Sequence, residues 1–274
     1  MKSLLTNDEI ENICTLYKSG LSSIKISKIY KRSPQGIRYI LGKNKVILRE
    51  NCDAGRKYSL NENYFTIIDT IDKAYFLGLL FADGCNTGRG VKLDLQVKDK
   101  EIIEKFVKYI NYGGVIYSTK RKSGYLDNCE MSSLVISSKK ISHDLTDHGC
   151  IERKTNFCDF PNIDKIFYNH FIRGVFDGDG GVYIDKRNQK RIHFTGNDIL
   201  IEKINDIISK NCLVKKSKIY FYKKCKKNII SITFSGNKNC EKIKNFLYKN
   251  CGDIFLSRKR DKLNVKFESP LIKI

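Results

Sequence analysis

The sequence predicts an α+β protein in which two similar halves follow a small all-helical domain. An apolar run that ends in acid-glycine occurs twice, as FLGLLFADG at 76–84 and as FIRGVFDGDG at 171–180. After each run, strand-like and helix-like stretches recur in the same order, so we expect each half to be αββαββα. The first fifty residues differ, because their apolar residues repeat only at helical spacing.

Residues 1–49 predict three short helices. Thr6 and Glu9 have the spacing of a capping box, and Gly20 is typical of a helix end. Ser33 before Pro34 is typical of a helix start. Through position 57 the chain has 12 Lys and Arg against five acids, which favours DNA binding over a neutral packing or protein-contact module. The segment resembles a resolvase-type helix-turn-helix, whose third helix lies in the major groove. The resemblance implies DNA contacts by Ser33, Gln35, Arg38 and Tyr39.

Residues 50–63 are polar and aperiodic, so we expect a linker there. The first half is then 64–158 and the second 159–274. Alternation and helical spacing predict strands at 91–97, 114–120, 133–138, 181–186, 191–196, 217–224 and 228–236. They predict the helices after the motifs at 99–110, 139–149, 197–211 and 237–250. Both halves end in similar tails that carry Arg153–Lys154 and Arg258–Lys259.

Two of the predicted strands have one apolar and one polar side. In the strand at 91–97, Val91, Leu93, Leu95 and Val97 alternate with Lys92, Asp94 and Gln96. In the strand at 217–224, Ile219 and Phe221 alternate with Lys218, Tyr220 and Tyr222. One side is therefore expected to pack on helices. The polar, basic side suits a groove of DNA, and an ordinary solvated sheet face is the alternative.

Composition narrows the class of partner. The formal charge is +21 and the pI is near 9.5, which indicates a polyanion. Nucleic acid is the first expectation, an anionic membrane surface the second, and AT-rich coding bias the alternative to both. No apolar run is long enough to span a membrane, and the first residues lack signal-peptide features, so we expect an intracellular protein. Ten cysteines without CxxC spacing argue against a disulfide framework or a zinc knuckle.

The repeated motifs predict a metal site. Gly78 and Ala82 lie four residues apart, as do Gly174 and Gly178, so small residues line one face of each helix. Such faces allow two helix backbones to pack closely, which would bring the motif aspartates together. Two carboxylates at helix C-termini repel each other and oppose the helix dipoles. A hard divalent cation such as Mg²⁺ offsets this, and it is also what phosphodiester hydrolysis needs. Solvated helix ends are the structural alternative.

The two motifs resemble the paired signature of the LAGLIDADG homing endonucleases over about residues 64–267. The first motif has Phe81 where the signature has its earlier aspartate, and the second keeps Asp177 there. The later acid, which the family uses for metal, is present in both as Asp83 and Asp179. The resemblance implies a monomeric, pseudo-two-fold enzyme whose two sheets form a saddle over DNA. It would cut both strands of a long pseudo-palindromic target.

The resemblance also implies a set of site residues. Asp83 and Asp179, with the carbonyls of Ala82 and Gly178, would bind Mg²⁺, with Mn²⁺ able to substitute. Gln96 would order water, and its second-half counterpart is expected at or near Phe194. The basic residues that stabilise phosphate charge would be Lys154 and Lys259, with simple backbone or solvent contact as the alternative. DNA contacts from the sheets are expected from Lys92, Asp94, Lys98, Lys218, Tyr220 and Tyr222.

Two other functions fit the same scaffold. An intron maturase would bind RNA and tolerate loss of the acids, and a transcription regulator would bind DNA without cutting it. Both motif aspartates are present, which favours the endonuclease.

Overall fold

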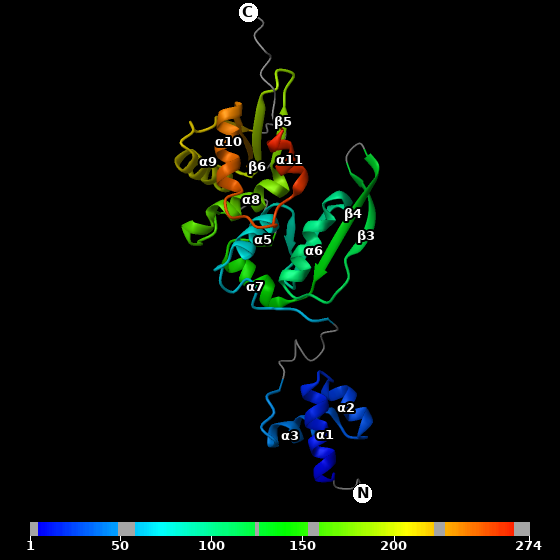
Figure 1. The fold of residues 1–274 in the computed structure, drawn as a ribbon. Coiled ribbons are helices and arrows are strands. Elements are labelled where there is room, and N and C mark those ends of the chain that lie inside the picture. The colour runs from blue at the N-terminus through cyan, green and yellow to red at the C-terminus, as the bar shows by residue number, and fades with distance from the viewer. Residues whose placement is uncertain (1–4, 49–57, 124–125, 153–158, 222–227, 266–274) are drawn as a thin grey trace, which may run out of the picture. The chain divides into compact units, whose positions relative to one another are not determined.

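The computed structural model describes residues 5–48, 58–123, 126–152, 159–221 and 228–265, with the backbone alone at 121–123 and 126–128 (Figure 1). The chain divides into two compact units, residues 1–59 and 60–274, and each is described by itself.

The smaller unit consists of three helices, α1 (Asn7–Lys18), α2 (Ser23–Ile29) and α3 (Pro34–Lys43). The predicted capping box at Thr6 and Glu9 is confirmed, as is the start of α3 at Ser33, whose side chain accepts from Gly36 N. The helices enclose a small core of buried residues, Ile13, Cys14, Tyr17, Ile26, Ile37 and Leu41.

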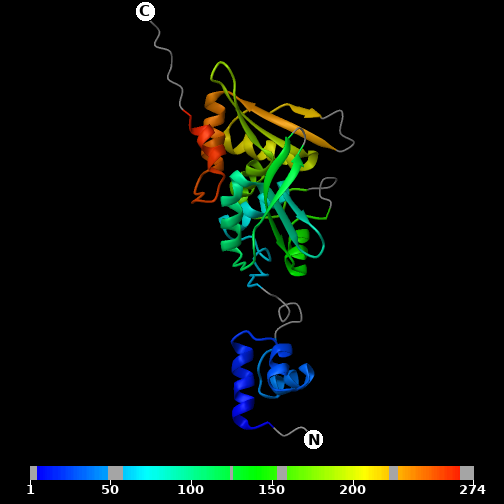
Figure 2. The same ribbon diagram turned by 90° about the vertical axis from the view of Figure 1, so that its right-hand side faces the viewer.

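The larger unit has the predicted α+β architecture, because the same αββαββα order of elements occurs twice. The first half contains α5 (Ile71–Ala82), β1 (Gly84–Asn86), β2 (Val91–Gln96), α6 (Lys100–Tyr109), β3 (Tyr117–Ser123), β4 (Leu126–Ile136) and α7 (Lys139–Asp147). The second contains α8 (Tyr168–Asp179), β5 (Gly181–Ile184), β6 (Lys190–Asn197), α9 (Asp198–Cys212), β7 (Ile219–Phe221), β8 (Ile229–Ser235), α10 (Asn237–Leu247) and α11 (Ser257–Asn264). Short 3₁₀ turns cover Val97–Asp99 and Lys165–Phe167. Figures 1 and 2 show the halves as cyan to green and as yellow-green to red ribbons.

The two sheets have identical topology. Their strand orders are β1-β2-β4-β3 and β5-β6-β8-β7, and all neighbouring pairs are antiparallel. The sequence did not predict β1 or α11. Three residues are too few to show alternation, and α11 reads SRKRDKLN, in which only Leu263 is apolar.

Helices α5 and α8 pack backbone to backbone at the centre of this unit (Figure 1). A methyl group on Gly174 would lie 2.1 Å from the carbonyl oxygen of Tyr75. One on Gly78 would lie 2.0 Å from the carbonyl oxygen of Phe171. The close helix pairing expected from the small residues is therefore confirmed, and no side chain larger than hydrogen fits at these two positions.

The strand ladders define which residues of the halves are equivalent. Gly84 sits against Leu80 and Gly180 sits against Phe176, so the two glycines correspond. Gly84 pairs with Leu93, whereas Gly181 pairs with His193, which puts Gly180 opposite Phe194. Leu93 therefore corresponds to Phe194, and both are buried.

The predicted alternation holds inside the strands and fails at their ends. Val91, Leu93 and Leu95 are buried as expected. Val97 is 38% exposed, because it lies in the 3₁₀ turn after β2, where alternation no longer applies. Phe221, expected to face inward, is 70% exposed. It is the last residue of β7, a three-residue strand at the edge of its sheet.

We expect Gly174→Ala to destabilise the larger unit, because the added methyl would clash with the backbone of α5 rather than with a movable side chain. Overpacking of this kind costs about 2–3 kcal/mol. Gly42→Ala is the matched control, since that helical glycine of α3 has open space around it and should gain stability. Urea unfolding measures both, and an unchanged midpoint for Gly174→Ala would contradict the close crossing.

Candidate active site

The C-terminal ends of α5 and α8 lie against each other. Asp83 is the residue that ends α5, and Asp179 is the last residue of α8. A methyl group on Gly178 would lie 2.2 Å from the Cβ of Ala82 and 2.8 Å from Oδ2 of Asp83. The Asp83 carboxylate is therefore placed against the residue that precedes Asp179. This close approach of the two helix ends is possible only because Gly178 has no side chain.

This arrangement offers oxygen ligands only. Asp83 is half-buried and Asp179 is exposed, and each follows directly on a backbone carbonyl at a helix C-terminus. Two carboxylates and the negative ends of two helix dipoles form the kind of donor set that a hard divalent cation prefers. The residues at the paired ends thus fit such a cation.

Lys259 caps the end of α8. It is buried, and its Nζ donates to the carbonyl oxygens of Phe176 at 2.7 Å, Asp177 at 2.5 Å, Gly178 at 3.1 Å and Gly180 at 2.7 Å. Burial lowers the pKa of this ammonium to about 8, against the opposing effect of Asp177. Lys259 therefore satisfies carbonyls that the helix leaves unpaired. It shares the Gly178 carbonyl, whose second lone pair is the one that could face a cation.

An ion pair between an exposed arginine and a buried aspartate ties the same tail to the other half. Arg258 donates from Nε and Nη2 to the two oxygens of Asp99, at 2.6 and 2.7 Å. Asp99 is buried just before α6, and its hydrogen bond is the main reason that the pKa of Arg258 is raised. Six residues after Asp99, Lys105 of α6 donates to the carbonyl oxygen of Asp253 at 2.6 Å. The tail of the second half is thus fixed to the first half.

Asp177 links three segments inside the core. Its Oδ2 accepts from the Tyr75 hydroxyl at 2.8 Å and from the backbone N–H of Leu256 at 2.9 Å. Burial raises the pKa of Asp177 to about 6. Among the described residues no hydrogen-bond partner reaches its Oδ1. The earlier aspartate of the second motif therefore holds α5, α8 and the tail together instead of facing its exposed neighbour Asp179.

A fully buried arginine supports this crossing. Arg173 donates to the carbonyl oxygens of Ile254 and Leu247, at 3.0 and 2.9 Å, and its Nη1 lies 2.8 Å from Nδ1 of His170. Because a guanidinium can only donate, Nδ1 must accept. Burial, and then the arginine charge, lower the pKa of His170 to about 4. The imidazole is therefore neutral at pH 7.

The structure places Gln96 at the exposed end of β2, opposite Met131 of β4. Continuing the register that pairs Leu93 with Phe194 aligns Gln96 with Asn197. The second-half residue equivalent to Gln96 is thus Asn197, three residues after the expected position at Phe194. Phe194 itself is buried and packs against Phe176. The Asn197 side chain accepts from Ile199 N and caps α9.

The other candidates on the larger unit are dispersed. Lys92 forms an ion pair with Asp94 at 2.8 Å on the outward face of β2. Lys98 is exposed in the turn after β2, and Lys218 and Tyr220 are exposed beside and within the edge strand β7. Two candidates, Lys154 and Tyr222, lie outside the described residues.

In the smaller unit the candidates surround the start of α3. Ser33 and Gln35 are exposed, and Tyr39 is 69% exposed. Arg38 is half-buried, and its Nε donates to Oγ of Ser23 in α2 at 3.4 Å. This contact links the Arg38 side chain to α2.

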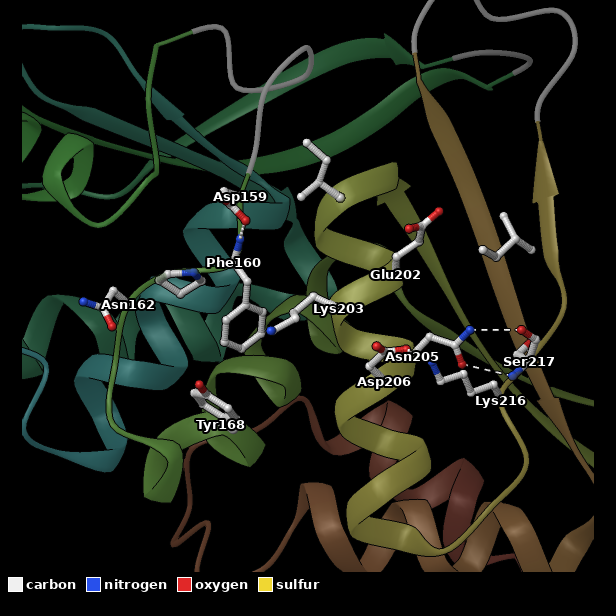
Figure 3. Close-up of a pocket in the computed structure, with 13 residues that line it drawn as sticks. Asp159, Phe160, Asn162, Tyr168, Glu202, Lys203, Asn205, Asp206, Lys216 and Ser217 are labelled. Atoms are coloured by element: carbon white, nitrogen blue, oxygen red, sulfur yellow. Dashed lines mark hydrogen bonds and ion pairs between the residues drawn. The ribbon is translucent and has the colours of Figure 1, made fainter.

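Two further features do not join this site. His143, Asp144 and Asp147 of α7 form the one group of three metal-type ligands found among the described residues, but Asp144 already accepts from Lys140 at 2.7 and 2.8 Å. A pocket of about 680 Å³ lies beside α9 (Figure 3).

Polar residues that line the pocket of Figure 3 pair with one another. Lys216 pairs with Asp206 at 2.6 Å, and the Asn205 amide bonds the backbone N–H and carbonyl of Ser217. Neither motif aspartate lines it.

Sequence reasoning missed the tail contacts. Asp99 and Arg258 are ordinary charged residues in sequence, 159 positions apart, and only the fold shows that they pair. Their one signal was the recurrence of Arg-Lys at both half-ends. Within the described parts of the chain, no helix is long and apolar enough to cross a membrane.

No protein-family model and no curated protein matches the chain. The chain is similar to the solved structure of the homing endonuclease I-WcaI bound to its DNA recognition sequence, with 16% identity over 81% of this chain and 96% of that one and a TM-score of 0.47. It is also similar to the I-LtrWI LAGLIDADG homing endonuclease bound to target DNA, with 14% identity, 74% and 89% coverage and a TM-score of 0.45. A third similar structure is the LAGLIDADG homing endonuclease I-GzeII in complex with its DNA target. Its sequence identity is 11% over 74% of this chain and 88% of that one, and the TM-score is 0.43.

Lys259→Met should lower the free energy of unfolding by about 2–3 kcal/mol, because buried carbonyls at the end of α8 would lose their donor. Lys262→Met on the same helix is the control and should stay within about 0.5 kcal/mol of wild type, since that side chain is exposed. Chemical unfolding at pH 7 measures both. Equal stability of the two variants would show that Lys259 does not cap α8.

His170 should make stability depend on pH. Its folded pKa of about 4 lies below the ordinary value of 6.5, so this contribution is complete above pH 6.5 and is lost as pH falls toward 4. On going from pH 7 to pH 4, His170→Gln should therefore lose about 3 kcal/mol less than wild type. The raised pKa of Asp177 acts in both proteins and cancels in the difference.

The control for this measurement is His143→Gln, because that histidine is exposed on α7. Its urea-unfolding curves should follow wild type across the pH range. If the stability of His170→Gln showed the same pH dependence as wild type, the conclusion that His170 is neutral in the folded protein would be wrong.

Proposed function

We propose that this chain is a divalent-metal-dependent endonuclease of the LAGLIDADG type that cuts both strands of a specific DNA target. The observation that supports this most directly is the placement of the Asp83 carboxylate against the residue before Asp179, at the joined ends of two helices. Two acids brought together where helix dipoles already disfavour them need a positive partner.

The proposed roles follow from the positions of the residues. Asp83 and Asp179, with the carbonyls of Ala82 and Gly178, would hold Mg²⁺ or Mn²⁺. Such a cation generates a nucleophilic water and offsets charge on the phosphate undergoing attack. Lys259 fixes the end of α8, so that the Gly178 carbonyl and Asp179 keep their orientation.

The DNA surface is proposed to be the outward faces of the two sheets. Strand faces of this kind can enter the major groove and carry side chains to phosphates and base edges. The outward face of the first sheet includes Lys92, Asp94, Gln96, Met131, Ser133 and Val135. That of the second includes Tyr183, Arg191, His193, Thr195, Tyr220, Ser231, Thr233 and Ser235. With a net charge of +21, binding should weaken steeply as salt rises.

The smaller unit would lengthen the contacted site. We propose that it is a helix-turn-helix in which Ser33, Gln35, Arg38 and Tyr39 of α3 face DNA. Their gathering on the exposed side of one helix supports this, and Tyr39 is the most exposed of them.

An RNA-binding splicing cofactor and a non-cleaving regulator are the competing functions. Neither requires two acids at adjoining helix ends, and that feature favours the nuclease. The two alternatives differ from each other in whether the preferred ligand is RNA or duplex DNA.

We expect the purified protein to cut a long, imperfectly palindromic site selected from a randomised duplex library, in Mg²⁺ and not in EDTA. Asp83→Asn and Asp179→Asn should each slow double-strand cleavage by about 100-fold or more, because several kcal/mol of charge stabilisation is lost. DNA affinity measured in Ca²⁺ should change little. Cleavage is followed on end-labelled duplex.

The control variant is Asp69→Asn, which removes an exposed carboxylate at the approach to α5. It should cut at the wild-type rate. Binding without cutting in Mg²⁺ and in Mn²⁺ would refute the nuclease, and RNA binding would then decide between the two alternatives. A collapse of DNA affinity in the motif variants would refute the metal role of the aspartates.

A further inference from the structure

His193 stands beside the second motif aspartate. It lies on the outward face of β6, where its cross-strand partners are Gly181 of β5 and Thr233 of β8. Gly181 follows Asp179 by two residues, so the imidazole is placed at the edge of the candidate active site. Neither the motif nor the proposed metal set includes it.

The ring lies directly over Gly181. A methyl group there would be 2.3 Å from Cε1 of His193 and 2.7 Å from Nε2. Glycine thus provides the space that the imidazole occupies. No described residue forms a hydrogen bond with either ring nitrogen, and the side chain is half-buried and reachable by solvent.

Two lysines of α11 share this region. Helix α11 packs on β5, and Lys259 and Lys262 are three residues apart, so they lie on one face of the helix. Both lysine charges act on the imidazole: after burial, they are the causes that lower the pKa of His193. The ammonium of Lys259 is already engaged by the carbonyls at the end of α8, whereas that of Lys262 is exposed. The imidazole of His193 and the ammonium of Lys262 together form a place for an anion.

The described residues of the first half are arranged differently. By strand register, Cys85 and Lys92 occupy the positions of Gly181 and His193. Lys92 is already paired with Asp94 at 2.8 Å. The residue equivalent to Asp94 is Thr195, which carries no charge. Within the described parts of the chain, only the second half therefore presents a side-chain nitrogen without an ion-pair partner at this position.

We propose that His193, together with Lys262, binds a DNA backbone phosphate next to Asp179, and that this contact exists at one of the two cleavage positions only. A phosphate is the ligand because it is the anion that duplex DNA brings to this surface, and because imidazole and ammonium groups both donate hydrogen bonds to its oxygens. The inference rests on the proposed DNA-cleaving function and makes the two halves inequivalent.

The test compares the two strands of the duplex recovered by library selection, each labelled at one end. His193→Ala should slow the cutting of one strand about tenfold more than that of the other, since a hydrogen bond to a charged group is lost at one position. Gly181→Ala, which keeps the imidazole but displaces it, should bias the strands in the same direction. His193→Gln retains a donor and should restore part of the rate. His143→Ala is the matched control and should leave both strands unchanged.

A binding measurement makes the result independent of cleavage. The chain has four histidines, so the His193 Cε1–H resonance can be assigned by substitution. Adding a random-sequence duplex in Ca²⁺ should shift that resonance and leave that of His143 in place. In Lys262→Met the shift should be smaller.

The outcomes separate the two claims. Equal slowing of both strands by His193→Ala, or no slowing, would overturn the contact while leaving the endonuclease intact. If the wild-type protein cuts no DNA, the endonuclease fails. The resonance then decides the contact: a shift supports it, and an unmoved His193 resonance overturns it.

Discussion

The candidate site depends on one steric constraint, the crossing of α5 and α8 at Gly78 and Gly174. There each helix touches the carbonyl oxygens of the other, with no room for a methyl group. A crossing this close fixes the distance between the helix axes, and therefore the distance between the helix ends. Because Asp83 and Asp179 are at those ends, the backbone contact several residues earlier determines how near the two acids lie. Larger residues at the crossing would push the two helices apart and so separate the acids.

The tail of the second half counters the electrostatic cost of this geometry. Lys259 places an ammonium on the carbonyls at the end of α8, and Arg258 places a guanidinium on Asp99 of the other half. In the same tail, the backbone N–H of Leu256 donates a hydrogen bond to Asp177. The negative ends of helices, the buried carboxylates and the basic tail are thus joined in one compact unit. The positive charge comes from the tail of the second half and reaches Asp99 of the first half, so these contacts form only when both halves are folded.

The sequence predicted the repeated architecture and the location of the acids because both follow from local patterns. Small residues four apart and an acid before glycine are visible without a structure. The failures occurred where a partner far along the chain decides the outcome. Asp99 pairs with Arg258 across the two halves, and Asp177 turns inward to Tyr75. Neither residue differs from a solvated acid in sequence. The expectation for Phe221 failed because alternation alone does not show that a strand is short and at the edge.

The two halves also differ at the positions that their symmetry relates. At one crossing point Tyr75 donates to Asp177, and at the equivalent point Phe171 packs edge-on against Phe81 at 5.0 Å between ring centroids. Pairing the second half with a copy of itself would place Asp177 against Phe171, which leaves a buried carboxylate without the Tyr75 donor, at a cost of about 1–3 kcal/mol or more. Pairing the first half with a copy of itself would place Tyr75 against Phe81. The polar pair and the apolar pair therefore favour joining unlike halves in one chain. Once the halves are unlike, the residues facing outward are free to diverge as well, as Lys92 and His193 have done. The DNA target that we propose for such a surface would need to be only imperfectly palindromic.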